Sequence, residues 1–528
     1  MDVDGLPALA ATARLIERPS GLDPWRTATG PRTATGFGII FVRMWWRWLR
    51  QRDTWAFIAI AVLVRGALFN VFLHEHGLHS AWYGWGAETG DTPGYFEPID
   101  SFLAGKAYRP DFRMPGYGLP YLLFRLCTTP QGAGTAIVFL QCLLGMASVV
   151  VLARCTRLFG APRWAQYLTC ILFAVMPRMA LYDVYWFTES FCTSAMIFST
   201  HGWLAHERSG SRAALLWSGV WMAWAVFLRP VQLIWFILLA IGTLTKARAS
   251  WRERWIATAL FLLPFVLSDG LWARRNQVMH HEIAPFSRGM VMPELANSPM
   301  YPLMRFLQAS GGNYIHWDPS AHIRWFNMRE GPLGRQGPRI DKDVVMPAFA
   351  LCESITEDSL RTWATDMSRW SDAQTTGEER MTLFREMNAR SDRFVRYYSD
   401  ERPWQHSVAS RLRLTALFFN RAGSGPLFHA PPIHPSTFRK PIEALDAPMH
   451  WAILCGGIIA ALWSLRQWRK ERFLAWLAGM TIISVFIVPW ALRLCEGRYL
   501  VPMYPWLLLL VVLAAVRLTG PRSAATAR

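Results

Sequence analysis

The sequence predicts an all-α polytopic membrane protein with about ten transmembrane helices. Of its 528 residues, 52% are hydrophobic, and the apolar residues gather in runs of roughly 17–22, each long enough to cross a bilayer as a helix. The basic residues, which give a net charge of +18, lie in short clusters between these runs, as they do in the cytoplasmic loops of membrane proteins. This distribution favours a basic membrane protein over a nucleic-acid-binding protein.

The chain begins with a polar tail at residues 1–36 and continues with a segment rich in Trp and Arg at 37–52, which is typical of a helix at the cytoplasmic interface. We therefore expect residues 1–53 and the tail at 519–528 to be cytoplasmic. An N-terminal transmembrane module at 54–273 and C-terminal helices at 449–518 are predicted between them. The predicted spans cover residues 54–73, 134–154, 164–182, 187–205, 213–228, 230–245, 255–273, 449–465, 472–491 and 499–517.

One apolar segment, residues 116–127, is left out of the spans because it is short and contains Pro120 and Arg125. With this segment outside the membrane, every inner loop is basic, as the positive-inside bias requires. We therefore expect it to be an interfacial helix within the first outer loop, residues 74–133. The same topology places the large polar insert, residues 274–448, on the outer side. Its helical patterns, separated by stretches rich in Pro and Gly, predict a mainly helical cap over the mouth of the bundle.

The first outer loop carries the main candidate for catalysis, Asp91, which precedes a Thr-Pro-Gly turn. Asp is common in turns for structural reasons, so Asp91 taken by itself is also compatible with a solvated loop acid that has no catalytic role. The surrounding aromatic residues can stack on sugar rings, although they can equally anchor a loop at the interface. These neighbours are Trp82, Tyr83, Trp85, Tyr95 and Tyr117.

Further charged residues fall on the predicted outer side. Asp183 and Glu189 lie at the junction of two spans, where a carboxylate is either a helix cap or a second acid of the cleft. Arginines at the membrane edge can grip phosphate oxygens, although any one of them can also simply extend toward the headgroups. These arginines are Arg178, Arg229, Arg274, Arg275 and Arg498.

Taken together, these segments resemble the GT-C superfamily of membrane glycosyltransferases, in the branch of the dolichyl-phosphate-mannose protein mannosyltransferases and the bacterial aminoarabinose transferase. The first outer loop has GDTPGY, LAGKAY and RMPGYGLPYLLF in the order of that family. Later matches are TES at 188–190, LRP at 228–230, RRN at 274–276 and RYLVPMYP at 498–505. The chain departs from the family in lacking a Glu directly after Asp91 and in carrying the 300–448 insert.

The resemblance implies transfer of one sugar from a polyprenyl phosphate to an acceptor hydroxyl on a lipid, glycan or protein, with inversion, at the extracytoplasmic face of the cell (inner) membrane. Asp91 would be the general base, and Asp183 or Glu189 the second acid. The implied substrate-binding residues are Tyr95, Arg113, Tyr117, Arg229, Arg274, Arg275, Arg498 and Tyr499. No cofactor or metal is expected to be required, although two carboxylates in the cleft could bind a divalent cation.

Two alternatives remain open at this stage. A transporter or flippase of lipid-linked sugars would show inverted repeats and broken helices at mid-membrane depth, neither of which is clear in the sequence. A polysaccharide polymerase or ligase would instead depend on residues of the large outer loop, such as His280, His281 and Arg288.

Overall fold

The structure is a computed structural model. It describes residues 50–77, 80, 82–89, 91–110, 113–245, 249–281, 300–312, 326–330, 336–340, 347–370, 372, 374–424 and 434–519. The predicted interfacial helix at 37–52 therefore lies almost wholly outside the described residues, as do Arg288 and the last nine residues.

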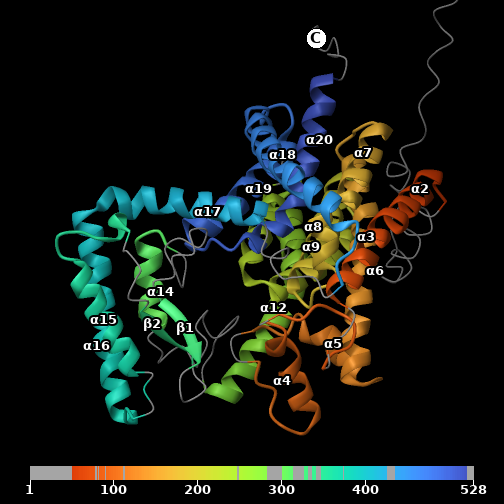
Figure 1. The fold of residues 1–528 in the computed structure, drawn as a ribbon. Helices are drawn as coiled ribbons and strands as arrows, with labels where there is room; N and C mark the ends of the chain where they lie inside the picture. The colour runs from red at the N-terminus through yellow and green to blue at the C-terminus, as the bar shows by residue number, and fades with distance from the viewer. Residues whose placement is uncertain are drawn as a thin grey trace, which may run out of the picture.

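The chain folds into a bundle of long helices with a smaller lobe at one side (Figure 1). Helices cover each of the ten predicted spans. In chain order the bundle contains α2 (Arg52–Ile60), η1 (Ala61–Arg65), α3 (Gly66–His76), α6 (Pro130–Leu158), α7 (Arg163–Val175), α8 (Pro177–Tyr182), α9 (Thr188–Ser209), α10 (Arg212–Leu228), η2 (Pro230–Gln232), α11 (Leu233–Leu244), α12 (Trp251–His280), α18 (Arg439–Arg466), α19 (Arg472–Trp490), η6 (Gly497–Met503) and α20 (Tyr504–Thr519).

Within the part of the chain that the structure describes, six helical segments are long and apolar enough to cross a membrane: 52–76, 130–158, 251–279, 439–466, 472–490 and 497–519. α10 and α11 are apolar but shorter. The prediction of an all-α polytopic membrane protein is confirmed, whereas ten crossings are not. The Ser and Thr residues of α9 give this helix a low hydropathy. It can nevertheless lie inside the bundle, because most of its length is buried against other helices rather than lipid.

Local signals explain where several helices begin and end. Ser250 caps α12 in a capping box with Glu253, so that side chains and backbone amides satisfy one another at the first turn. α9 ends at Gly210, whose φ of 69° is the left-handed conformation that glycine adopts without steric cost. Pro177 interrupts the helix after Val175, because proline lacks the amide hydrogen and disfavours helical geometry in the residue before it.

The break at Pro177 places the α8–α9 turn well inside the bundle. α7 has 13 residues, which span about 20 Å at about 1.5 Å per residue, less than the roughly 30 Å of a bilayer core. Asp183, in the turn, contacts Arg65 in the π-helical turn η1. η1 is followed by all of α3, which rises about 16 Å further. The α8–α9 turn therefore lies deeper in the bundle than the C-terminal end of α3.

The first outer loop contains two short helices, α4 (Pro93–Leu103) and α5 (Gly118–Arg125), which lie at the end of the bundle opposite the C-terminal end of α20 (Figure 1). α5 falls within the predicted interfacial segment at 116–127, and its 8 residues are too few to cross a bilayer. The aromatic residues of the loop are packed together: the Phe96 ring stacks on that of Tyr121 at 4.0 Å between centroids.

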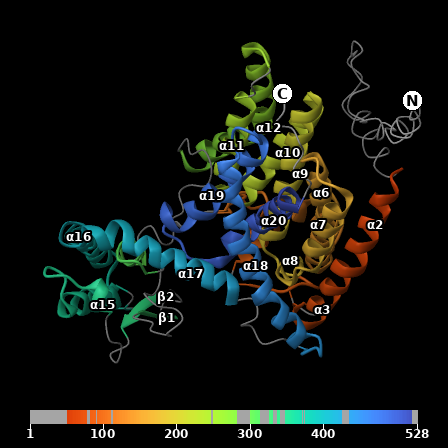
Figure 2. The same cartoon turned by 90° about the horizontal axis from the view of Figure 1, so that it is seen from above.

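The insert forms the lobe beside the bundle (Figures 1 and 2). Its elements are α14 (Met300–Ala309), β1 (Phe326–Glu330), β2 (Gln336–Ile340), η3 (Ala348–Ala350), α15 (Glu357–Trp370), α16 (Gly377–Glu401), η4 (Gln405–Ala409) and α17 (Ser410–Ser424). The antiparallel pair β1–β2 adds a hairpin that helical patterning did not predict. The lobe has a core of its own, with Phe306, Trp363 and Met387 buried in it. α12 and α18 continue past the predicted insert boundaries at 274 and 448.

Candidate active site

Asp91 is held between two arginines that come from opposite ends of the chain. Arg113 of the same outer loop donates to Asp91 Oδ1 at 2.8 Å, and Arg498 of η6 donates to Oδ2. The Asp91 side chain is 26% exposed. The carboxylate therefore lies at the edge of the bundle, oriented by both contacts and still accessible to a ligand.

Arg498 connects Asp91 to two further carboxylates. Its Nε lies 2.7 Å from Glu496 Oε2 and 3.9 Å from Glu189 Oε1. Glu189 is fully buried in the first turn of α9 and forms an ion pair with Arg229, the residue that directly follows α10. Three carboxylates and three arginines from distant segments thus converge at one place. We call Asp91, Arg113, Glu189, Arg229, Glu496 and Arg498 the charged cluster.

Aromatic rings lie against the arginines of the charged cluster. The guanidinium of Arg113 lies 4.1 Å from the centroid of the Tyr95 ring, and that of Arg229 lies 4.1 Å from the centroid of Tyr499. Such contacts stabilise a partly desolvated cation. Tyr117 is buried beside Tyr95 and donates a hydrogen bond to Gln141 on α6. The predicted tyrosines therefore support the arginines and the loop.

The electrostatic setting favours an ionised Asp91. Burial by itself raises the pKa of the Asp91 carboxyl, but the charges and hydrogen bonds of Arg498 and Arg113 outweigh it, so the pKa lies below its ordinary value. Burial raises the pKa of Tyr95, so its phenol remains neutral. At neutral pH the site offers a carboxylate that can accept a proton beside a neutral hydroxyl that can donate a hydrogen bond.

Asp183 belongs to a different network from Glu189. It accepts a hydrogen bond from Arg65 Nε at 2.8 Å and another from Ser190 Oγ at 2.5 Å, and it is almost completely buried. Gln141 donates to the backbone carbonyl of Asp183, which ties the turn to α6. Of the two acids expected near the cleft, Glu189 is the one that the structure brings to the Asp91 side.

The remaining arginines have other partners. Arg274 donates to Gln277 one turn further along α12, and Arg275 donates to the carbonyl oxygen of Tyr108 in the outer loop. Arg178 forms an ion pair with Asp446 of α18, with 2.5 Å between Nη2 and Oδ2. Arg178 thus connects two helices, Arg275 connects α12 to the loop and Arg274 contacts its own helix, whereas Arg229 and Arg498 contact the carboxylates of the charged cluster.

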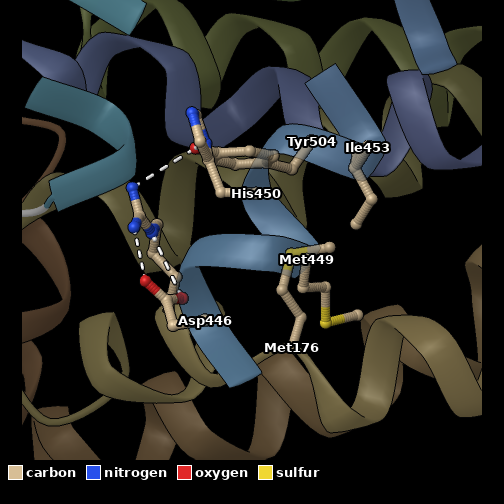
Figure 3. Close-up of a pocket in the computed structure, with 7 residues that line it drawn as sticks. Met176, Asp446, Met449, His450, Ile453 and Tyr504 are labelled. Carbon is tan, nitrogen blue, oxygen red and sulfur yellow. Dashed lines mark hydrogen bonds and ion pairs between the residues drawn. The ribbon is translucent and has the colours of Figure 1, made fainter. Parts of the chain in front are cut away.

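A small cavity lies beside the Arg178–Asp446 pair, between α8, α18 and the start of α20 (Figure 3). Figure 3 shows Met176 and Met449 on one side of it and His450 with Tyr504 on the other. His450 Nδ1 lies 2.5 Å from the hydroxyl of Tyr504, and Arg178 also donates to that hydroxyl. Through these contacts the Arg178–Asp446 pair connects α8, α18 and α20 at one buried position.

Sequence reasoning missed Glu496, and it left Arg65 without a role. The position of Glu496 two residues before Arg498 could have indicated its role, because this spacing lets its carboxylate contact the guanidinium. Arg65 could be found as a charge inside an apolar span, but its partner Asp183 is 118 positions away. Among the residues that the structure describes, no group of three or more His, Cys, Asp or Glu side chains is placed to hold a metal ion.

No protein-family model matches the sequence, and no curated protein matches it. Among solved structures, the chain is similar to the crystal structure of ArnT from Cupriavidus metallidurans in the apo state. The two share 14% sequence identity over 87% of this chain and 77% of that chain, with a TM-score of 0.31. At these values the similarity does not by itself establish the family to which the chain belongs.

Proposed function

We propose that the protein is an integral-membrane glycosyltransferase of the GT-C type. It moves one sugar from a polyprenyl-phosphate donor to an acceptor hydroxyl at the extracytoplasmic face of the membrane. The observation that carries the proposal is the charged cluster, in which an ionised, partly exposed Asp91 lies between Arg113 and Arg498 at the edge of a membrane helix bundle. A base next to cations is the combination that sugar transfer from a phosphate requires.

In the proposed reaction the acceptor oxygen attacks the anomeric carbon from the side opposite the phosphate, which inverts the configuration. The bond between the anomeric carbon and the phosphate oxygen breaks, and the phosphate leaves with the bonding electrons. The proton of the acceptor hydroxyl passes to Asp91. Each Asp91 oxygen accepts one arginine hydrogen bond and keeps a lone pair for this proton.

The other members of the cluster have supporting roles in this scheme. Arg498 and Arg113 stabilise the negative charge that grows on the leaving phosphate, because guanidinium groups remain cationic and match phosphate geometry. Glu189, fixed by Arg229, is placed to accept hydrogen bonds from sugar hydroxyls. Arg274 and Arg275, which the resemblance assigned to phosphate, are not part of the proposed phosphate site, given their contacts along α12 and to the Tyr108 carbonyl.

The test is Asp91→Asn, assayed with a panel of radiolabelled polyprenyl-phosphate sugars in membranes that contain acceptors. We expect turnover to fall by about 10²–10⁴-fold, the range for loss of a positioned base, while thermal melting still shows a folded protein. Asp100→Asn is the matched control, because Asp100 forms an ion pair with Arg125 in the same loop, away from the cluster. Full activity of Asp91→Asn would refute the assignment of the base.

A further inference from the structure

Glu496 has an unusual position for a residue of a phosphate site. It immediately precedes η6, and its carboxylate accepts a hydrogen bond from Arg498 Nε at 2.7 Å. Its side chain is 19% exposed, whereas that of Glu189 is fully buried. Glu496 can therefore turn toward water, while Glu189 is fixed in the helix bundle by Arg229.

The charged cluster has no net charge when its members are ionised. Its three arginines offset its three carboxylates, and Arg498 is shared among Asp91, Glu189 and Glu496. An anionic ligand gains little from a site whose cations are already paired. For a phosphate to bind there, one carboxylate must release Arg498. Glu189 is fully buried, and Asp91, although 26% exposed, is also held by Arg113. Glu496 is partly exposed and is therefore the carboxylate that can turn away into water.

We propose that Glu496 acts as an internal competitor for the phosphate, occupying Arg498 in the empty site and giving way when a lipid-linked phosphate binds. This inference rests on the proposed function and adds a residue that controls affinity at that site. Arg498 keeps its contact with Asp91 during the exchange, so the base stays oriented while the phosphate takes the place of Glu496 at Nε.

The exchange has its largest effect on product release. The sugar-linked donor is a phosphodiester with one negative charge, whereas the product is a phosphomonoester with about −1.5 to −2 at neutral pH. A monoester would bind an unopposed arginine more tightly than the donor does. Return of Glu496 to Arg498 lowers the affinity for the product and frees the site for the next donor.

The experiment measures binding of farnesyl phosphate and of uncharged farnesol to the purified full chain in detergent, for wild type and Glu496→Gln. We expect Glu496→Gln to lower the Kd for farnesyl phosphate by about fivefold (about 1 kcal/mol), the upper range for a partly exposed ion pair, and to leave the farnesol Kd unchanged. Glu443→Gln is the matched control, because it breaks a partly exposed ion pair with Arg439 on α18.

The outcomes separate the inference from the proposed function. If wild type binds farnesyl phosphate and Glu496→Gln binds it equally well or more weakly, Glu496 is not a competitor and the inference is overturned, while the proposed function stands. An equal gain for farnesol would also overturn it, since the effect would then not depend on charge. If wild type shows no preference for farnesyl phosphate over farnesol, the phosphate site itself is absent and both fail.

Discussion

Arg113 depends on a close approach of the backbone to reach Asp91. A Cβ atom added at Gly94 would lie 2.6 Å from Arg113 Nε, so a larger residue there would displace the guanidinium from its present position. Asp91 and Arg113 are 22 positions apart within the first outer loop, and their ion pair lies beside Arg498 of η6. Residue 94 therefore matters to the site without contacting a ligand.

The dependence of activity on pH at the acid end should reveal the effect of Arg113 and Arg498 on the pKa of Asp91. Since they hold its pKa below the ordinary value, the carboxylate stays ionised to lower pH than a free aspartate. Its ion-pair stabilisation is complete above the unfolded-state pKa of about 3.9 and is lost as the pH falls through the lower folded-state pKa. Replacing Arg113 with Gln removes one cation, so we expect the acid limb of kcat/KM to move to higher pH.

The control for Arg113→Gln is Arg369→Gln, which breaks an exposed ion pair with Glu379 in the lobe. It should leave the pH–rate profile unchanged. An acid limb that stays in place in Arg113→Gln would show that a group other than Asp91 limits the rate at low pH.

At the scale of elements, α8 has a buried ion pair at each end. Arg65 contacts Asp183 at its end, and Asp446 contacts Arg178 near its start. Both pairs are almost fully buried, so loss of one partner leaves an uncompensated charge. We expect Asp446→Ala to destabilise the protein by about 3–5 kcal/mol, measured by thermal unfolding in detergent.

A double variant tests whether α8 is held in place by the charges of the Arg178–Asp446 pair or by the volume that the two side chains fill. In Arg178→Met with Asp446→Leu, both charges are replaced by apolar groups of similar volume, and buried pairs often tolerate this exchange. We expect most of the lost stability to return. A double variant as unstable as Asp446→Ala would mean that Tyr504 and His450 need Arg178 itself for their hydrogen bonds.

Each of the ten ranges that the apolar runs predicted as helical is helical in the structure, because hydropathy is a local property. The partners within the site were not predictable in the same way. Asp91 and Arg498 are 407 positions apart, and their contact is decided by how α4 and η6 pack. Asp183 and Glu189 are close in sequence, yet the turn between α8 and α9 sends them to different arginines.

At the scale of the whole molecule, the charge pattern predicts which side of the membrane each end of the bundle faces. The lobe and the loop of α4 and α5 should face outward, and the turn between α18 and α19 inward. A cysteine placed at exposed Glu378 of the lobe should react with an impermeant maleimide in intact cells. One placed at exposed Arg469 should react only after permeabilisation.

Labelling requires a background without the exposed native cysteines, Cys127 and Cys455, which serine can replace. Protection of the Glu378 cysteine in intact cells would reverse the topology. It would also move the proposed transfer to the cytoplasmic face.

The π-helical turn Ala61–Arg65 has a consequence for how this chain can change over time. Such a turn contains one residue more than the α-helical turn it replaces. The turn takes up its extra residue locally, so the helical segments on either side keep the register of one continuous helix. Its last residue, Arg65, is the partner of the buried Asp183. Insertions and deletions within this turn are therefore constrained, because a shift of Arg65 would leave the buried charge of Asp183 without its partner.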